Sequence, residues 1–312
     1  MDLSPKMKPV IFIIADVPGW ALDRTAENVI KRLSNQFRFK KVFNAQAVEE
    51  INKNDYDLLY ITYWRQFQDA SINIKISSPA ITGIRSHFKW DKGKGLPPTE
   101  EMLNHINSFK AVNVPSSILY DIFKDKHPAL FYTPHGVDQH IFVPAKNPFS
   151  SPAGELVVGW TGSKHNHPGK RGIDDLLIPA LNNLKGVKLI TAAREDKWRT
   201  QEEMVSFYQH LDAYICTSRT EGGPHPLLEA SSCGIPIIST NVGIAPDLIE
   251  NNKNGILINR SIDSIIKAVT ILRDNPELRR NMAIQARKVI EQSWTWDIQA
   301  QNYVPFFEKG LS

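Results

Sequence analysis

The chain has 312 residues, of which 42% are hydrophobic and 22% are charged, values typical of a globular protein long enough for two domains. The formal net charge of +4 is mild, and no apolar run approaches the roughly twenty residues of a bilayer span, so we expect neither a transmembrane helix nor a nucleic-acid-binding protein. Cys216 and Cys233 lie in apolar contexts and make no disulfide framework or metal cluster. Together with the absence of a signal-peptide core at the start, they predict buried thiols in a cytoplasmic protein.

The N-terminal half alternates apolar runs with segments of helical spacing. Pro9–Ala15 is a continuous apolar run typical of a buried parallel strand, and Ala21–Leu33 has the periodicity of an amphipathic helix. Further strands are expected at Arg38–Phe43, Asp57–Thr62, Ser77–Arg85, Ala111–Pro115 and Ala129–Thr133. Strands that alternate with helices predict an α/β fold with a doubly wound parallel sheet.

A second alternating block begins with the apolar strand Leu156–Gly162 and runs to about Glu291. The stretch before it, Pro144–Gly154, is rich in Pro, Ser, Asn and Ala, as linkers are. A final helix follows, with Ser293 or Thr295 as its N-cap. We therefore predict one domain over residues 1–148 and a second over residues 149–295.

Two glutamates flank a glycine-containing turn in the second block. Glu221 follows the expected strand Ala213–Ser218, and Glu229 lies on a short helix that ends before Gly234. A strand-to-helix turn offers backbone N–H groups and the positive end of the helix dipole to an anion, and each carboxylate can accept bonds from adjacent hydroxyls. The unit therefore fits a diphosphate between two polyols, as in a nucleotide-sugar. The alternative is a pair of solvated glutamates beside an ordinary turn.

The residues around this turn resemble the donor-site signature of family 4 glycosyltransferases. The matching segments are Ser218–Ala230, Cys233–Pro236, Asn241–Gly243, Asn254–Ile258, Asp274–Arg279, Ala286–Arg287 and Trp294–Trp296. In the N-terminal half the resemblance is patchy, although Pro134-His135-Gly136-Val137-Asp138 is similar to the family's interdomain turn. The resemblance implies the GT-B architecture, in which two Rossmann-like doubly wound domains face a cleft. It also implies that a C-terminal helix, about residues 296–312, crosses back to the N-terminal domain.

The resemblance implies a retaining glycosyltransferase that moves a sugar from a nucleotide-diphosphate sugar to a saccharide or glycoconjugate acceptor. The N-terminal domain would bind the acceptor and the C-terminal domain the donor. The co-substrate would be a nucleotide-sugar of the UDP or GDP type, with no further cofactor. By association with the family, the setting is bacterial surface polysaccharide or glycoconjugate biosynthesis. Two alternatives remain open: a nucleotide-sugar epimerase of the same fold, and a protein that binds a nucleotide-sugar without turnover.

Three cations are candidates for contacts with the diphosphate. Lys164, Lys170 and Arg171 follow the first strand of the second domain, where the family places an arginine and a lysine–glycine pair. Arg171 directly precedes Gly172 and so takes the place of the family's lysine, with Lys170 as a close rival. A guanidinium in place of an ammonium keeps the charge and adds a two-pronged donor. The alternative is a loop of ordinary surface cations.

The turn itself would supply backbone donors. Its glycines are Gly222 and Gly223, and Pro224 stands where the family has a residue with an N–H group. Because proline removes that donor, we expect phosphate contacts from Gly223, His225 or Leu227. By resemblance, Glu229 would hold the ribose hydroxyls. Glu221 would hold the transferred sugar and help to stabilise the developing cation.

Two positions in the N-terminal half are weaker candidates. His87 follows an expected strand, where the family often places a histidine beside the donor sugar, but a structural or solvated histidine fits equally well. Gly19, in the first turn, would let the backbone approach the diphosphate, or would simply begin a helix.

Two further patterns bear on metals and membranes. Asp55-Tyr56-Asp57 spells the metal-binding Asp-x-Asp of another glycosyltransferase architecture, but it precedes a strand instead of following one, so we predict no metal requirement. The basic segments Lys31–Arg32 and Arg38–Lys41 lie beside aromatic residues. They fit a peripheral contact with anionic lipid at the inner face of the membrane, an acidic acceptor, or a solvated charged face.

Overall fold

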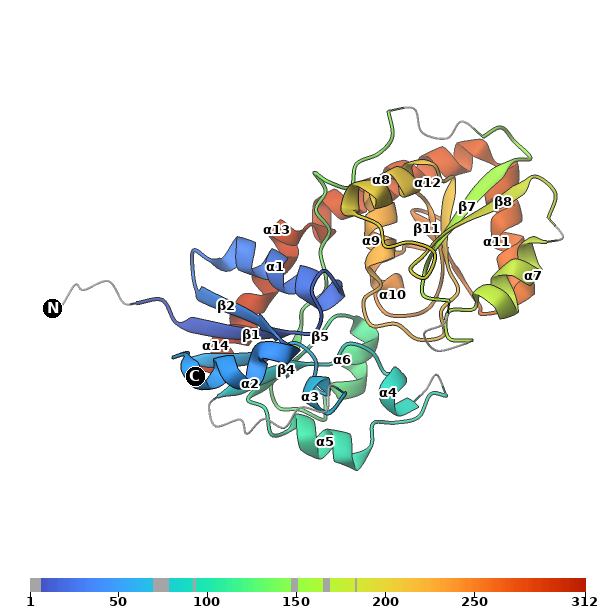
Figure 1. Ribbon diagram of the computed structural model, residues 1–312. Coiled ribbons are helices and arrows are strands. Elements are labelled where there is room, and N and C mark those ends of the chain that lie inside the picture. Colours follow the sequence, from blue (N-terminus) through green and yellow to red (C-terminus); the bar gives the residue numbers. More distant parts are fainter. Residues whose placement is uncertain (1–6, 70–78, 92–93, 147–150, 165–168, 183) are drawn as a thin grey trace. The chain divides into compact units, whose positions relative to one another are not determined.

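The computed structural model describes residues 7–69, 79–91, 94–146, 151–164, 169–182 and 184–312. The chain divides into two compact units, each built around its own sheet (Figure 1). The first unit comprises Met1–Arg85, Leu96–His135 and Trp296–Ser312. The second comprises Ser86–Gly95 and Gly136–Thr295.

Within the described residues, the first unit contains a six-stranded sheet in the order β2-β1-β3-β4-β5-β6, and all its strand pairs are parallel. The strands form where the sequence has short apolar runs, because both faces of a parallel sheet are covered by helices. Their bounds are β1 Val10–Ala15, β2 Arg38–Phe43, β3 Leu58–Ile61, β4 Ala80–Gly83, β5 Ala111–Val114 and β6 Leu130–Tyr132. Each expected strand is therefore confirmed, with residues 77–78 of the fourth lying outside the described residues.

Helices connect these strands and cover the sheet. They are α1 Ala21–Leu33, α2 Asn44–Lys53, α3 Gln66–Asp69, α5 Glu100–Ile106 and α6 Ser117–Phe123. Thr99 and Ser116 cap α5 and α6 by accepting a hydrogen bond from a backbone N–H in the first turn. The C-terminal segments α13 (Trp296–Gln299), a 3₁₀ turn (Ala300–Asn302) and α14 (Tyr303–Leu311) complete the unit, and their aromatic side chains join the core of strands β1 and β3.

The second unit has a five-stranded parallel sheet in the order β11-β10-β9-β7-β8. Its strands are β7 Leu156–Gly162, β8 Val187–Ala193, β9 Ala213–Cys216, β10 Ile237–Thr240 and β11 Gly255–Ile258. In each unit the first strand lies between the second and the third, which is the order of a doubly wound sheet. The predicted α/β fold with two Rossmann-like domains is thus confirmed.

Helices after β7 pack on both faces of the second sheet. They are a π-helical turn Ile173–Leu177 that continues into α7 (Ile178–Leu181), α8 Gln201–Gln209, α9 His225–Ser232, α10 Ala245–Leu248, α11 Ile262–Asp274, α12 Pro276–Val289 and a second π-helical turn Ile290–Trp294. The short helix α4 (Phe88–Asp91) also belongs to this unit. Arg279 of α12 is fully buried, and its guanidinium donates to the carbonyls of Glu155 and Leu272. A buried cation that bonds to carbonyls ties α11 and α12 to the start of β7.

The division between the units differs from the expected one. The expected boundary between residues 148 and 149 lies outside the described residues, and the units divide between His135 and Gly136 instead. The reason is that the chain has already joined the second unit at Val137, which pairs with Thr295 and packs, with Phe142, in the core beneath α9. The chain returns to the first unit between Thr295 and Trp296, where the final helix was expected to begin.

Among the described residues, no helix combines the length and the apolar character needed to cross a bilayer. Both cysteines are buried free thiols.

Shortening Phe307 to alanine should destabilise the protein by about 3–5 kcal/mol. Its ring is fully buried and lies edge-on to Phe37, Phe39 and Tyr60, so its loss leaves a cavity between α14 and the sheet. Urea denaturation of Phe307→Ala measures the effect. The exposed Ile298 of α13 is the control, and Ile298→Ala should shift stability by no more than about 0.5 kcal/mol. A loss of stability in Phe307→Ala no larger than the small loss expected for Ile298→Ala would show that α14 contributes little to the first unit.

Candidate active site

The predicted donor residues of the second unit follow two neighbouring strands. In the sheet, β8 lies on one side of β7, and β9 lies on the other side, followed by β10 and β11. The topological switch point of the sheet is therefore between β7 and β9. Lys170 and Arg171 lie in the loop after β7, and Glu221 lies in the loop after β9. Ligands of open α/β sheets bind where such loops separate at the carboxyl ends of the strands. The topology therefore brings these residues to the edge at which a ligand is expected.

An ion pair joins the two loops. Arg171 Nη1 donates to Glu221 Oε1 at 2.6 Å, and the Glu221 side chain is largely shielded from solvent. The negative charge of Glu221 is the main cause that raises the pKa of Arg171. The sequence assigned Arg171 to the diphosphate and Glu221 to the sugar, and it did not indicate that the two side chains contact each other. The pair fixes the orientation of the carboxylate and leaves it charged.

Backbone and hydroxyl contacts hold these loops against each other. The N–H of Arg219 donates to the Lys170 carbonyl at 2.8 Å, and Thr217 Oγ1 donates to the Arg171 carbonyl at 2.7 Å. Gly172 has φ 72°, and a Cβ at this position would lie 2.7 Å from the Thr217 carbonyl oxygen. The close approach and the left-handed backbone both require glycine here.

Arg260 contacts the loop after β7 and was not identified from the sequence. Its guanidinium donates to the Thr217 carbonyl at 3.1 Å and to the Gly169 carbonyl at 2.7 Å. Arg260 lies shortly after β11, far along the chain from both partners. Since its role depends on contacts between distant segments, no local pattern could have identified it.

Glu229 is buried, and its carboxylate has a partner that the sequence did not reveal. Tyr208 of α8 donates its hydroxyl to Glu229 Oε2 at 2.8 Å. Burial raises the pKa of Tyr208 well above its usual range, so the phenol stays protonated and acts as a donor. Tyr208 therefore positions the carboxylate that was expected to hold the ribose.

The turn between the glutamates is shaped by a third glycine. A Cβ on Gly243 would lie 2.8 Å from the Gly222 carbonyl oxygen, so this segment can approach the turn only because it lacks a side chain. Gly222, Gly223 and His225 stay in the turn and at the start of α9, as expected. The side chain of Leu227 is fully buried, and its N–H donates to the Pro224 carbonyl at 3.1 Å. A phosphate contact from Leu227 remains a prediction.

The structure places His87 with the second unit and close to the same charges. Burial is the main cause that lowers the pKa of His87, while the charges of Lys170 and Glu221 act on it in opposite directions. Burial also lowers the pKa of the Lys170 ammonium, and the Glu221 carboxylate works against this. His87 and Lys170 thus lie near the Arg171–Glu221 pair, in agreement with the predicted grouping. Their roles remain predictions.

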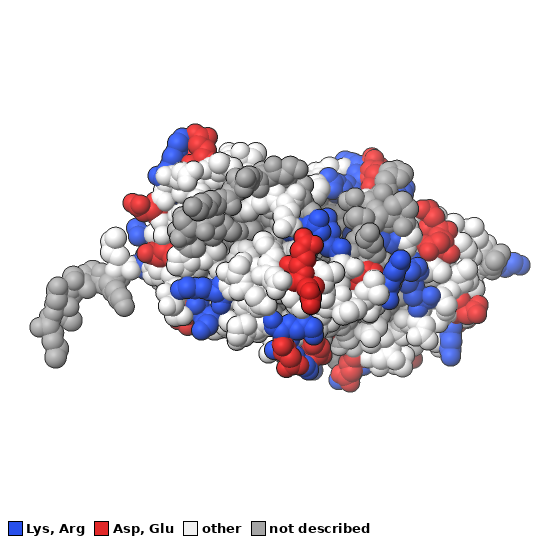
Figure 2. All heavy atoms as spheres, turned by 90° about the horizontal axis from the view of Figure 1, so that it is seen from below, with Lys and Arg blue, Asp and Glu red and all other residues white. Residues whose placement is uncertain are grey.

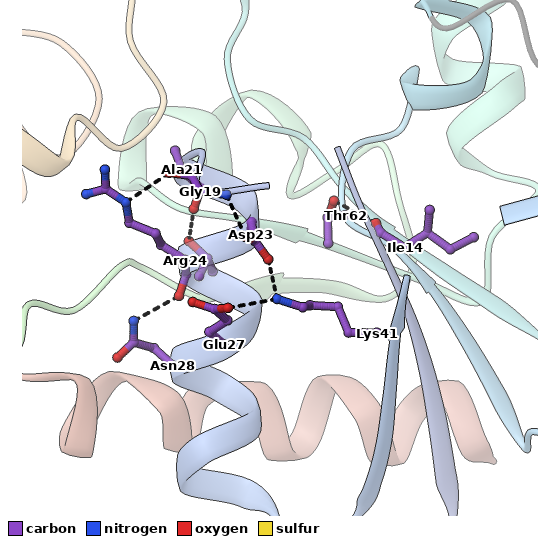
Figure 3. A network of polar contacts seen from close by, with 10 residues as sticks. Ile14, Gly19, Ala21, Asp23, Arg24, Glu27, Asn28, Lys41 and Thr62 are labelled. Carbon is purple, nitrogen blue, oxygen red and sulfur yellow. Dashed lines mark hydrogen bonds and ion pairs between the residues drawn. The ribbon is translucent and has the colours of Figure 1, made fainter. Parts of the chain in front are cut away.

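Two other candidates have contacts elsewhere. Lys164 pairs with Asp196 at 3.0 Å, and its backbone N–H donates to Glu195, two residues after the end of β8. Gly19, in the first unit, has φ 75°, and its N–H donates to Asp23 Oδ2 at 2.7 Å (Figure 3). Asp23 thus holds the turn before α1 through the Gly19 N–H, and an approach of Gly19 to the diphosphate remains a prediction.

The basic residues of the N-terminal half are largely matched by acids. Lys41 pairs with Asp23 and Glu27, as Figure 3 shows, and Arg32 pairs with Asp297. On the face seen in Figure 2, lysines and arginines lie among acidic residues. A solvated charged face accounts for this arrangement, and contact with a membrane remains a prediction.

The Asp-x-Asp segment has a structural role at the start of β3. Asp57 Oδ2 accepts a hydrogen bond from the Val10 N–H at 2.7 Å, which links the entries of β1 and β3. In the part of the chain that the structure describes, no group of three or more His, Cys, Asp or Glu side chains could hold a metal ion. Metal independence remains a prediction.

Solved glycosyltransferase structures have the same fold. HepE (Alr3699) from Anabaena, solved with UDP and glucose, superposes with a TM-score of 0.72 over 96% of this chain and 99% of its own, at 16% identity. The sucrose-phosphate synthase from Thermosynechococcus elongatus gives a TM-score of 0.71 over 97% of this chain and 99% of its own, at 13% identity. These likenesses establish the GT-B fold that the resemblance implies.

Curated relatives match over a shorter stretch. The GDP-mannose-dependent alpha-(1-6)-phosphatidylinositol monomannoside mannosyltransferase of Mycobacterium tuberculosis is 28% identical over 113 residues, which are 34% of this chain and 29% of that protein. CapM of Staphylococcus aureus, a capsular polysaccharide biosynthesis glycosyltransferase, is 25% identical over 111 residues, again 34% of this chain and 29% of the relative. The matches thus cover less than a third of either relative.

Replacing Gly172 by alanine should destabilise the second unit more than the same change at Gly169. Both residues have nearly the same positive φ, 72° and 73°, so both variants carry the left-handed strain of about 1–2 kcal/mol. Only at Gly172 does the new Cβ meet a backbone atom, because nothing lies within 4 Å of the position at Gly169. Denaturant unfolding of the two variants measures the difference. Equal stabilities would mean that the loop can move away from Thr217 at no cost.

One family model matches part of the second unit. Residues 197–289 match the model for glycosyl transferases group 1. This span contains Glu221, Glu229 and the turn between them, together with the positioning residues Tyr208 and Arg260. Residues 197–289 are thus similar to glycosyl transferases group 1, which confirms the resemblance seen in the sequence.

Proposed function

We propose that this protein transfers a sugar from a nucleoside-diphosphate sugar to a saccharide or glycoconjugate acceptor with retention of anomeric configuration. The observation that carries the proposal is the ion pair between Arg171 and Glu221 at the switch point of the second sheet, with Lys170 beside it. Positive charge and an oriented carboxylate together meet the two requirements of glycosyl transfer. These are a stabilised diphosphate leaving group and a tolerated positive charge at the anomeric carbon.

The cations would act on the diphosphate. As the bond between the anomeric carbon and the phosphate oxygen breaks, negative charge grows on the departing nucleotide. Lys170 and Arg171, both partly buried, would stabilise that charge more strongly than fully solvated cations could. The N–H groups of the Gly222–His225 turn, at the start of α9, would add donors to the same phosphates.

The carboxylates of Glu221 and Glu229 would bind different parts of the nucleotide-sugar. Glu229, oriented by Tyr208, would accept hydrogen bonds from the ribose hydroxyls of the nucleotide. Glu221 would accept bonds from the transferred sugar and, as a negative charge, favour the cationic transition state. His87 would contact the sugar near the same carboxylate, in the neutral form that its lowered pKa favours.

The names of the similar proteins suggest the donor class. GDP-mannose appears in the name of the mycobacterial relative, and UDP and UDP-glucose are bound in structures of Anabaena HepE. We propose a UDP- or GDP-sugar as donor and, from the name of the capsular relative, a polysaccharide or glycoconjugate acceptor. The cytoplasm is the proposed location, in keeping with two buried free thiols.

A thermal-shift screen against UDP-, GDP-, ADP-, TDP- and CMP-sugars is the first test. A donor that binds the folded state alone raises the unfolding temperature, so a UDP- or GDP-sugar should do so and also be consumed when acceptor saccharides are present. A changed sugar still attached to its nucleotide would identify an epimerase instead. Binding with neither hydrolysis nor transfer would identify a non-catalytic binding protein.

Replacing Glu229 by alanine should weaken the binding of the bare nucleoside diphosphate by about 1.5–3 kcal/mol, the range of hydrogen bonds to a charged group. Tyr208→Phe should give a smaller loss, because the carboxylate stays but loses one orienting bond. Isothermal titration calorimetry measures both variants. Glu250→Ala removes an exposed glutamate and is the control. Wild-type affinity in Glu229→Ala would exclude the proposed contact with the ribose.

Replacing Glu221 by alanine should lower turnover by about a hundredfold or more, because the group acts on charge that develops only in the transition state. Affinity for the bare nucleotide should change much less. Nucleotide release from the donor, followed with acceptor present, measures turnover, and calorimetry measures affinity. A parallel loss of both quantities would contradict the separate roles of Glu221 and Glu229.

A further inference from the structure

The sheet of the first unit has a topological switch point of its own. In the sheet, β2 lies on one side of β1, and β3 lies on the other side, followed by β4, β5 and β6. The loops that follow β1 and β3 therefore separate at the carboxyl ends of these two strands. Asp16 directly follows β1, and Thr62 directly follows β3. A ligand-binding crevice is expected at this edge for the same topological reason as in the second unit.

Arg85 is held rigidly beside this edge. Its Nε donates to the Thr62 carbonyl at 2.6 Å, and its Nη2 donates to Asn113 Oδ1 at 2.9 Å and to the Tyr60 hydroxyl. The guanidinium lies where a side chain on Gly83 would have to be, since a Cβ there would be 2.0 Å from Nη2. Contacts from β3, β5 and the end of β4 therefore fix the guanidinium before any ligand binds.

One guanidinium nitrogen and one carboxylate oxygen remain without a partner. Arg85 Nη1 and Asp16 Oδ1 are both buried, and neither has a hydrogen-bond partner among the described residues. Burial is the main cause that raises the pKa of Asp16, and the charge of Asp23 adds to the rise. Backbone hydrogen bonds at Val17 and Asp16 and, to a smaller extent, the positive charge of Arg85 oppose it. Buried polar atoms in folded proteins nearly always have partners, so a donor and an acceptor left over at one sheet edge indicate a ligand that supplies both.

The loop that carries Asp16 is also fixed. Asp23 accepts a hydrogen bond from the Gly19 N–H and forms an ion pair with Lys41 (Figure 3). These two contacts fix the turn between β1 and α1. Arg24 donates to the Gly19 carbonyl at 3.1 Å and closes the turn from the other side. The position of Asp16 therefore does not depend on a flexible loop.

We propose that Arg85 Nη1 and Asp16 Oδ1 form a hydroxyl-binding subsite for the saccharide acceptor, an assignment that rests on the proposed function. A sugar hydroxyl accepts a hydrogen bond from the guanidinium and donates its own proton to the carboxylate, so it satisfies both atoms at once. An anionic ligand would meet the charge of Asp16, and a metal ion would meet the charge of Arg85. The mixed pair thus selects a neutral polyol.

Saturation-transfer NMR with methyl α-D-glucopyranoside, methyl α-D-mannopyranoside and methyl α-D-galactopyranoside as probes tests the subsite. Wild-type protein should bind at least one of them, and both Asp16→Asn and Arg85→Lys should weaken that binding by about tenfold or more, the scale of one charge-assisted hydrogen bond. Asp121→Asn, at an exposed acid on α6, is the matched control and should bind as the wild type does. Thermal unfolding of each variant verifies that it is folded.

Nucleotide-sugar binding, measured on the same samples by calorimetry, separates this proposal from the proposed function. Asp16→Asn should bind the donor within about twofold of the wild type, because the variant leaves the second unit unchanged. Glycosides that bind the wild type and Asp16→Asn equally, or that do not bind the wild type at all, would overturn the subsite while leaving the donor site standing. Failure of every nucleotide-sugar to bind the wild type would instead overturn the proposed function.

Discussion

The ion pair between Arg171 and Glu221 connects the two loops on which the candidate site is built. The Glu221 side chain is 10% exposed and that of Arg171 is 30% exposed, so the guanidinium supplies the cation that a largely buried carboxylate requires. The pair can form only because hydrogen bonds from Thr217 and Arg219 hold the loops together and because Gly172 allows the close approach. Charge placement in the second unit thus depends on backbone geometry at a single glycine.

Different side chains hold the loop after the first strand in the two units. Each sheet has a switch point beside its first strand, and each requires the loop after that strand to stay in place. In the second unit the loop is held by Arg260 and Thr217, which bond to its carbonyls. In the first unit the corresponding turn is held by Asp23, whose carboxylate bonds to the Gly19 N–H and to Lys41. Both arrangements order the edge of the sheet before a ligand arrives, which lowers the entropic cost of binding.

Glycines in this chain illustrate how a missing side chain can position a functional group. Gly83 leaves space for the guanidinium of Arg85, and Gly243 leaves space for the turn between Glu221 and Glu229. In both cases the feature that matters is the neighbour that occupies the space. For Gly83 this is a side chain two residues along the chain, and for Gly243 it is a turn on another segment. The importance of Gly243 therefore comes from a tertiary contact.

The sequence by itself determined the order of strands and helices, the doubly wound class of both sheets and the position of the two glutamates. Short apolar runs, helical periodicity and the glycine-containing turn are local patterns, and local patterns are sufficient for these features. Thus α1, β2 and β7 have the bounds that the sequence indicates. Only the tertiary structure decided the contact of Arg171 with Glu221, the support of Glu229 by Tyr208 and the point at which the chain changes units. Each of these depends on which distant segments pack together, and no local pattern encodes such pairings.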